Sequence, residues 1–277
     1  MIKFFRKIRQ SLLTENKFSK YLIYAIGEII LVVIGILIAL QINNWNENLI
    51  KSKEEIHILK ALKIGLEADL TDLKFNKKSI QSSIASANKV IYSLENNLPY
   101  RDSIPDYIGH MMFPVIFVHS TSAFETLKSK GINLIKNDNL REEIINVYDS
   151  QYSFFLKNES LIFLEEAERA LRELFSPRFE ESYVYDFNEP NFKPRLTPLD
   201  YEALKTDQEF KYFLKSFKNR LNLLSKFHYR RLMKQVEALI LSIDSELKSK
   251  IRCLNHATKL YGCKVKKTVG IHLKNKQ

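Results

Sequence analysis

Few residues in this chain have the type and spacing that catalysis or metal binding requires. Its six histidines include no HxxxH or HExxH pair that could share a helix face as metal ligands. The sequence has no GxGxxG or Walker-type phosphate loop and no GxSxG nucleophile motif. His228 falls on an apolar helical stripe, where a packed histidine is more common than a ligand. The sequence therefore predicts a protein that is not an enzyme and that holds no cofactor or metal.

Two cysteines, Cys253 and Cys263, lie ten residues apart in a basic C-terminal region. In an oxidising compartment they could form a disulfide, although spacing in the sequence does not establish closeness in space. The sequence leaves both outcomes open: one disulfide or two free thiols.

One carboxylate, Glu28, lies inside the most apolar stretch of the chain. Residues 21–42 (YLIYAIGEIILVVIGILIALQI) contain no other Asp, Glu, Lys, Arg or His. A helix needs about 20 such residues to cross about 30 Å of hydrocarbon. Tyr21 at one edge and Trp45 just past the other are typical interfacial anchors. The stretch therefore predicts a transmembrane helix.

Two alternatives to a membrane span fit the apolar stretch less well. A cleaved signal peptide is one, but Ala39-Leu-Gln41 is a poor cleavage site and the leader is long. A buried core helix is the other. It would need partners on every side, and the rest of the chain shows mostly one-sided apolar stripes.

One face of this helix has features of a helix-packing surface. Steps of three and four residues place five residues on it: Tyr24, Glu28, Leu31, Gly35 and Ala39. Gly35 and Ala39 form a small-xxx-small pair, which permits close helix approach, and an intramembrane carboxylate is a functional candidate. We expect this face to pack on a second copy or on a partner membrane protein. Two alternatives are a neutral Glu28 without a role and a Glu28 that couples to protons.

The net charge of +11 is concentrated at the two ends of the chain. Residues 1–20 contain six basic residues and one acidic residue, and residues 246–277 contain nine basic residues and one acidic residue. By the positive-inside rule, the N-terminus is cytoplasmic and the polypeptide after the span is periplasmic. A nucleic-acid-binding protein would carry its basic stripe on the folded body, so we expect the lipid bilayer, and no nucleic acid, as partner.

The scarcity of breakers, with seven glycines and seven prolines, favours long helices. Residues 46–97 contain no proline and carry an apolar stripe that includes Leu59, Leu62, Leu66, Leu70 and Leu73. Helices are also predicted over about 139–175 and within 199–261. The predicted fold is all-α, with one N-terminal transmembrane helix continuing into an elongated antiparallel bundle of long helices.

Several local signals place the ends of these helices. Pro99 and Pro105 are expected to end the first helix, and a capping box at Ser122 opens a short helix that Gly131 stops. Asn139 is expected to start the next helix. Residues 177–198 contain four prolines and many aromatic residues, and they are expected to form a loop, either a lid over one end of the bundle or a recognition surface.

The chain divides by these signals into four segments. They are a basic cytoplasmic segment (1–20), the transmembrane helix (21–42), a periplasmic helical bundle (43–250) and a basic C-terminal tail (251–277).

The stretch ENKFSKYLIYAIGEIILVVIGILIALQINNWNE, residues 15–47, resembles the N-terminal signature of an uncharacterised family of bacterial single-pass membrane proteins. The resemblance continues more weakly through residues 124–149 and covers about residues 1–250. It implies a membrane location and no specific activity, and with the charge asymmetry it predicts the bacterial inner membrane. We expect a scaffold or interaction subunit at that membrane. The alternative is a periplasmic ligand-sensing module that acts through a partner membrane protein.

Overall fold

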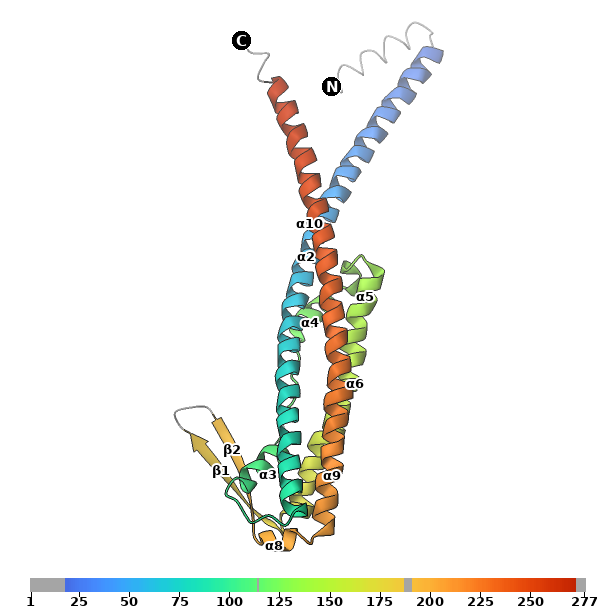
Figure 1. Cartoon of the computed structure of the whole chain (residues 1–277). Helices are drawn as coiled ribbons and strands as arrows, with labels where there is room; N and C mark the ends of the chain where they lie inside the picture. The colour runs from blue at the N-terminus through green and yellow to red at the C-terminus, as the bar shows by residue number, and fades with distance from the viewer. Residues whose placement is uncertain (1–17, 114, 187–190, 273–277) are drawn as a thin grey trace. The chain divides into compact units, whose positions relative to one another are not determined.

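The computed structural model describes residues 18–113, 115–186 and 191–272 (Figure 1). The described chain is mainly helical, which confirms the predicted all-α class. It divides into two compact units, Met1–Glu55 and Ile56–Gln277. Helix α2 (Phe18–Glu95) contributes to both units, and every other described element belongs to the second unit, here called the body.

Helix α2 runs without interruption for 78 residues because no proline occurs in it. Its last residue is Glu95, and Asn97, two residues further on, has a φ of 51°, the left-handed conformation typical of the residue that follows a helix. The backbone N–H of Leu98 donates to the carbonyl of Ser93 at 2.9 Å and closes the last turn. Asn97 therefore ends the helix two residues before Pro99, and Pro105 lies in the first turn of α3 (Ile104–Met112).

The next helices begin slightly away from the predicted residues. Helix α4 (Ser122–Lys130) has Thr121 at its N-cap without a side-chain hydrogen bond, so the predicted capping box at Ser122 is wrong. Gly131 ends α4 with a φ of 96°, as predicted, and the short η1 (Ile132–Leu134) follows. Asn137, not Asn139, caps the following helix, because its side chain accepts from the N–H of Leu140.

A continuous helical run over residues 138–175 matches the helix predicted over about 139–175. Its segments alternate between α-helix and π-helix: α5 (Asp138–Ile145), η2 (Asn146–Gln151), α6 (Tyr152–Glu159), η3 (Ser160–Leu164), α7 (Glu165–Ala170) and η4 (Leu171–Phe175). Each π-helical segment shifts the helix face that follows, and such segments are frequent at functional sites.

The loop predicted over residues 177–198 is wrong, because these residues contain an antiparallel hairpin of β1 (Phe179–Asp186) and β2 (Asn191–Pro198). A two-stranded sheet leaves one edge of each strand unpaired, so it accommodates Pro194 and Pro198 in β2. Strand β2 packs against α3, where a Cβ added to Gly109 would lie 1.9 Å from the Pro194 carbonyl oxygen. Only glycine allows this approach.

The C-terminal helices begin at two aspartate caps that divide the helix expected within 199–261. Asp200 caps the short α8 (Tyr201–Leu204) through the N–H of Ala203, and Asp207 caps the next helix through the N–H of Phe210. From there the chain is helical to residue 272, through α9 (Gln208–Leu223), η5 (Leu224–Tyr229) and α10 (Arg230–His272).

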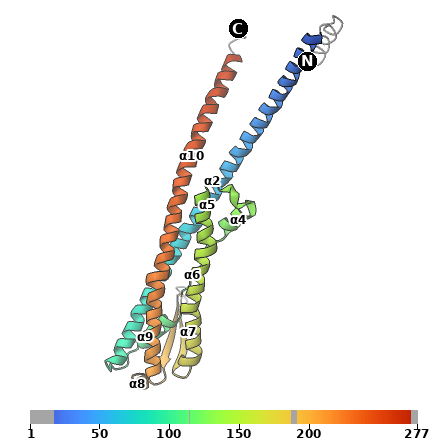
Figure 2. The ribbon, with the colours of Figure 1, turned by 90° about the vertical axis from the view of Figure 1, so that its right-hand side faces the viewer.

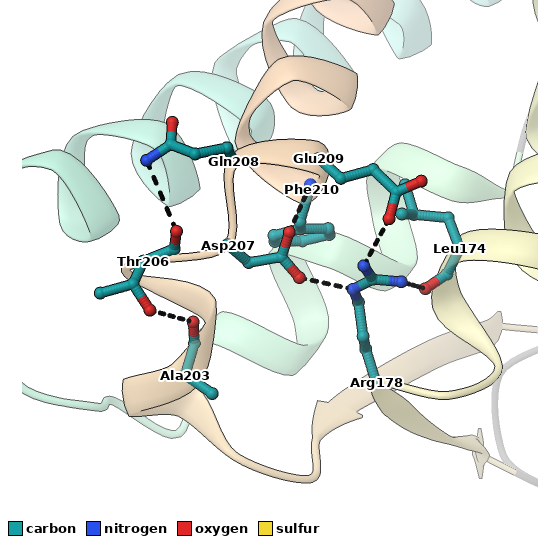
Figure 3. A network of polar contacts seen from close by, with 8 residues as sticks. All are labelled: Leu174, Arg178, Ala203, Thr206, Asp207, Gln208, Glu209 and Phe210. Carbon is teal, nitrogen blue, oxygen red and sulfur yellow. Dashed lines mark hydrogen bonds and ion pairs between the residues drawn. The ribbon is translucent and has the colours of Figure 1, made fainter.

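Arg178 ties the base of the hairpin to the start of α9 (Figure 3). Its guanidinium donates to Asp207 and Glu209, both at 2.6 Å, and to the carbonyl of Leu174 at 2.8 Å. Asp207 thus caps α9 and binds Arg178 at once. The Arg178 hydrogen bond and charge lower the pKa of the Asp207 carboxyl despite the opposing effect of burial.

Three ion pairs show that α2 runs antiparallel to the C-terminal helices within the body. Lys63 pairs with Asp244 at 2.7 Å, Lys74 with Glu237 at 3.8 Å, and Glu95 with Lys215 at 2.5 Å. The body portion of α2 and the helices α9 and α10 run side by side in both views (Figures 1 and 2). The predicted antiparallel arrangement is therefore present. The largest fully buried side chains are mostly aromatic: Tyr152, Tyr229, Phe155, Phe163, Phe175, Phe210 and Phe217.

Candidate functional site

The apolar stretch of α2 is exposed on all sides within the first unit. Its eleven large apolar side chains between Ile29 and Ile42 are all 46% to 66% exposed. By length and composition, this is the one described helix able to cross a membrane, and none of its most apolar window is buried. This exposure differs from that of the core helix of a soluble protein, which is mostly buried.

The predicted packing face is open along most of its described length. Leu31 is 66% exposed, Ala39 is exposed, and a Cβ added to Gly35 would meet nothing within 4 Å. Glu28 is partly buried. The side chain of Tyr24 lies outside the described residues. A second helix could therefore approach closely along the side of α2 that carries Leu31, Gly35 and Ala39. This packing face stays a prediction.

The two predicted interfacial anchors are only partly described. Trp45 lies three residues beyond Ile42 and is 44% exposed. The side chain of Tyr21 lies outside the described residues, as does the basic segment before Phe18.

Cys253 and Cys263 both lie in α10, and Cys253 is an exposed free thiol. Ten residues of α-helix separate two Cα atoms by about 15 Å, whereas a disulfide needs Cα atoms within about 7 Å. The side chain of Cys263 is outside the described residues. A disulfide between these two residues of one chain is therefore incompatible with the helix as the structure has it.

Within the body, α2 carries a regular buried stripe that we call the seam. Its eleven positions follow alternating steps of three and four residues: 59, 62, 66, 69, 73, 76, 80, 83, 87, 90 and 94. None of them is more than 3% exposed. Such spacing is typical of helices that pack along their length. Every seventh residue in the middle of the seam is polar, namely Asp69, Asn76 and Ser83.

Asp69 holds the segment 115–121, which connects α3 to α4, against α2. Its Oδ1 accepts from the backbone N–H of Ser120 at 2.7 Å, and its Oδ2 accepts from the hydroxyl of Tyr152 at 2.6 Å. Tyr152 lies on α6 and is fully buried. One carboxylate therefore joins α2, the segment 115–121 and α6.

Glu159, also on α6, makes a second junction of the same kind. Its Oε2 accepts from the backbone N–H of Phe117 at 3.1 Å, and its Oε1 accepts from the hydroxyl of Tyr229 on η5. Asp72 accepts from the backbone N–H of Val118 at 3.1 Å. Three carboxylates thus bind three backbone N–H groups of the segment 115–121. This segment belongs to no helix or strand.

The other two polar seam residues, Asn76 and Ser83, also make hydrogen bonds near the segment 115–121. Ser83 donates to the carbonyl of His110 on α3 at 3.1 Å. Asn76 donates to Asp72 at 3.0 Å. In the described part of the chain, the side-chain oxygen of Asn76 accepts no hydrogen bond.

Burial is the main influence on the ionisation of these groups. It raises the pKa of the Asp69 and Glu159 carboxyls above their usual range, although the hydrogen bonds from Tyr152 and Tyr229 oppose the shift. Burial also raises the pKa of both tyrosine hydroxyls, and the adjacent carboxyls add to that shift. The tyrosines therefore stay protonated and donate.

This cluster is suited to fixing the fold rather than to reacting with a substrate. Its carboxylate oxygens are occupied by donors from the chain, and the described residues contain no group of three metal-ligating side chains. A surface depression of about 270 Å³ lies between α7 and α9. Its Glu166 already pairs with Arg169 at 2.5 Å and with Arg220 at 3.2 Å. These groups would have to leave one another to bind a charged ligand.

Sequence reasoning missed the buried polar cluster. The apolar stripe was drawn through Leu70, but Leu70 is only partly buried and Asp69 occupies the seam. The signal that could have revealed it is the strict alternation of three- and four-residue steps, which selects position 69.

Comparison with protein families gives one match. The model described as a family of unknown function (DUF6090) matches residues 28–175. The match covers more than half of the chain, over a shorter range than the 1–250 expected from the resemblance. Neither the curated proteins nor the solved structures contain a significant match to this sequence.

Proposed function

The chain belongs to the family of unknown function DUF6090, and we propose that it is a single-pass membrane protein whose body acts as a scaffold or interaction subunit rather than as an enzyme. The observation that carries the proposal is the exposure of every large apolar side chain from Ile29 to Ile42. A surface of this kind is stable only where lipid or another apolar surface covers it.

The energetics of insertion support the span despite Glu28. On an insertion scale, Ile, Leu and Val each contribute about −0.3 to −0.6 kcal/mol, so the eleven residues contribute about −5 kcal/mol. A carboxylate near the middle of a span opposes insertion by about 3 kcal/mol. The balance favours the membrane, and a neutral or hydrogen-bonded Glu28 would favour it further.

The proposed location is the bacterial inner membrane, with residues 1–20 in the cytoplasm and the body in the periplasm. The support is the charge asymmetry around the span. Six basic residues precede it, whereas residues 43–55 contain two basic and three acidic residues.

The buried carboxylates of the body bind its own backbone and so stabilise its fold, which suits an interaction role. Asp69, Asp72 and Glu159 fix the segment 115–121 between helices, so these three carboxylates act within the fold and the body presents a fixed surface. In the membrane, Leu31, Gly35 and Ala39 offer a face for a second copy or a partner membrane protein.

Reporter fusions test the location. Alkaline phosphatase fused after Gln277 is expected to be active, and a green fluorescent protein fused there and exported through the general secretion route is expected to be dark. The opposite pattern would contradict the orientation. An N-terminal tag retained on the membrane-bound product is expected, and its loss would indicate a cleaved signal peptide.

Cysteine crosslinking tests the packing face. In a Cys253→Ser, Cys263→Ser chain, single cysteines at Gly35 and Ala39 are expected to crosslink in native membranes to a second copy or a partner. Cysteines at Val33 and Leu37, on the opposite face, serve as controls and are expected to crosslink far less. Equal crosslinking at all four positions would contradict the face.

A further inference from the structure

Helix α10 continues well past the core of the body. Among the side chains that the structure describes, its last buried one is Leu247, yet the helix extends to His272. Ile251, Arg252 and Cys253 are all exposed. Both views show α10 continuing beyond the end of α5 (Figures 1 and 2). The 25 residues from Lys248 to His272 make about 37 Å of helix.

This extension leaves the body at the end where α2 enters it. The ion pairs Lys63–Asp244 and Lys74–Glu237 show that α10 residue numbers rise as α2 residue numbers fall. The same register sets residue 251 opposite residue 56, the first residue of the body. Residues 43–55 connect the apolar stretch to that point, and thirteen residues cannot span more than about 45 Å. The extension, about 37 Å long, is therefore comparable in length with the longest connection that these thirteen residues could make.

The sequence of the extension is basic and one-sided. From Lys248 to the C-terminus the chain carries nine Lys and Arg residues and no Asp or Glu. Ile251, Leu254, Tyr261 and Val265 follow the steps of three, four and seven residues that are typical of an amphipathic helix. A basic amphipathic helix is typical of a peptide that lies on an anionic membrane surface.

An isolated helix with this composition is only marginally stable in water. It contains Gly262 and Gly270 and several β-branched residues, all of which disfavour helix. Short helices owe most of their stability to a packed face. The body leaves residues 251–253 exposed, so it supplies no packed face to these residues at the start of the extension.

We propose that residues 248–272 of α10 bind the anionic phospholipid headgroups of the same membrane that residues 21–42 cross, an inference that rests on the proposed membrane span. The body would then be attached to the bilayer at two points, one inserted helix and one surface helix. Two attachments restrict the tilt of the body relative to the bilayer, which suits a scaffold.

A fluorophore on Cys263 tests the proposal in the full chain. The Cys253→Ser chain is labelled at Cys263 and assembled into nanodiscs of phosphatidylcholine alone or with added phosphatidylglycerol. Quenching by acrylamide, which is neutral and does not respond to surface charge, is expected to be weaker in the anionic discs. At about 1 M salt, where charges are screened within about 3 Å, the difference between discs is expected to vanish.

Two charge variants sharpen the test. A Lys264→Gln, Lys266→Gln, Lys267→Gln chain is expected to bind the anionic surface about a hundredfold more weakly, at about 1 kcal/mol per lost charge. In anionic discs, the acrylamide quenching of this variant should match that of the parent chain in neutral discs. The matched control loses three exposed body lysines and should behave like the parent chain: Lys78→Gln, Lys157→Gln and Lys226→Gln.

The outcomes separate the two proposals. Equal quenching in both kinds of disc, with the chain still incorporated, would overturn the binding of α10 to lipid and leave the membrane span intact. A chain that fails to incorporate into either kind of disc would overturn the membrane span and the surface helix with it.

Discussion

Helix α2 contains two regions whose side chains follow opposite patterns. Between Ile29 and Ile42, eleven large apolar side chains point in every direction and all are 46% to 66% exposed. Between Leu59 and Leu94, the eleven seam positions follow three- and four-residue steps and none is more than 3% exposed. The first region has the pattern expected of a helix in a uniform apolar solvent, and the second has the pattern of a helix packed against protein on one side.

The two regions also treat polar groups differently. The apolar stretch contains one carboxylate, Glu28, whereas the seam contains a polar residue at every seventh position from Asp69 to Ser83. A polar group in a packed seam is stable only when a specific neighbour satisfies it, so it selects one register of packing. Lipid offers no such neighbour. The contrast teaches that the spacing of apolar and polar residues alone can suit two parts of one helix to two different environments.

Replacing Leu66 by arginine is expected to have the largest effect on the body. Leu66 is fully buried in the seam, so Leu66→Arg buries an unpaired charge and should cost more than about 4 kcal/mol, enough to unfold the body. Ile64→Arg, two residues away and 67% exposed, is the matched control and should change stability by less than about 0.5 kcal/mol. Near-UV circular dichroism during heating measures both. Similar unfolding curves for the two variants would contradict the seam.

Removing the Asp69 carboxylate is expected to have the next largest effect. Asp69→Ala leaves the N–H of Ser120 and the hydroxyl of Tyr152 without an acceptor, and each costs about 1–3 kcal/mol. Asp69→Asn keeps one acceptor and should lose about half as much stability. Urea unfolding followed by far-UV circular dichroism compares the two variants. An Asp69→Ala chain as stable as the parent would show that the cluster does not hold the segment 115–121.

Asn76→Leu is expected to act in the opposite direction. The Asn76 side-chain oxygen accepts no hydrogen bond within the described residues, so burying it is unfavourable. Leucine at this seam position should raise the free energy of unfolding by about 1 kcal/mol. The urea midpoint checks this. A loss of stability as large as that of Asp69→Ala would mean that all polar seam residues are equally required.

The smallest expected effect is a pH dependence carried by Asp69. Burial raises its folded-state pKa above the ordinary value of 3.8, so its stabilising contribution is complete below pH 3.8 and is lost as pH rises through the folded-state pKa. The parent chain should therefore lose stability relative to Asp69→Asn as pH rises across that window. Urea midpoints of both chains at a series of pH values measure the difference. A difference that does not change with pH, or that changes with the opposite sign, would contradict the account.

Patterns that act over a few residues could be predicted from the sequence. The helix class, the long first helix, the run over 138–175 and the stop at Gly131 all follow from breakers and local periodicity. The exposed apolar stretch was equally visible, because its composition alone departs from that of a core helix.

Features that depend on distant partners could not be predicted. Asp69 is buried because Ser120 and Tyr152, which lie 51 and 83 residues away, satisfy it. Hydrophobicity alone favours Leu70 over Asp69 as the seam residue. The hairpin was missed for a similar reason: its prolines signal a loop locally, and the packing of β2 on α3 through Gly109 is a long-range contact.

Alkaline carbonate extraction of the full-length chain tests the membrane span most directly. The parent chain is expected to remain in the membrane pellet, because the apolar stretch from Ile29 to Ile42 has no protein cover among the described residues. A Val33→Arg, Leu37→Arg chain, in which two charges cost about 5 kcal/mol or more in the bilayer, is expected in the supernatant. A parent chain released into the supernatant by carbonate would contradict the account.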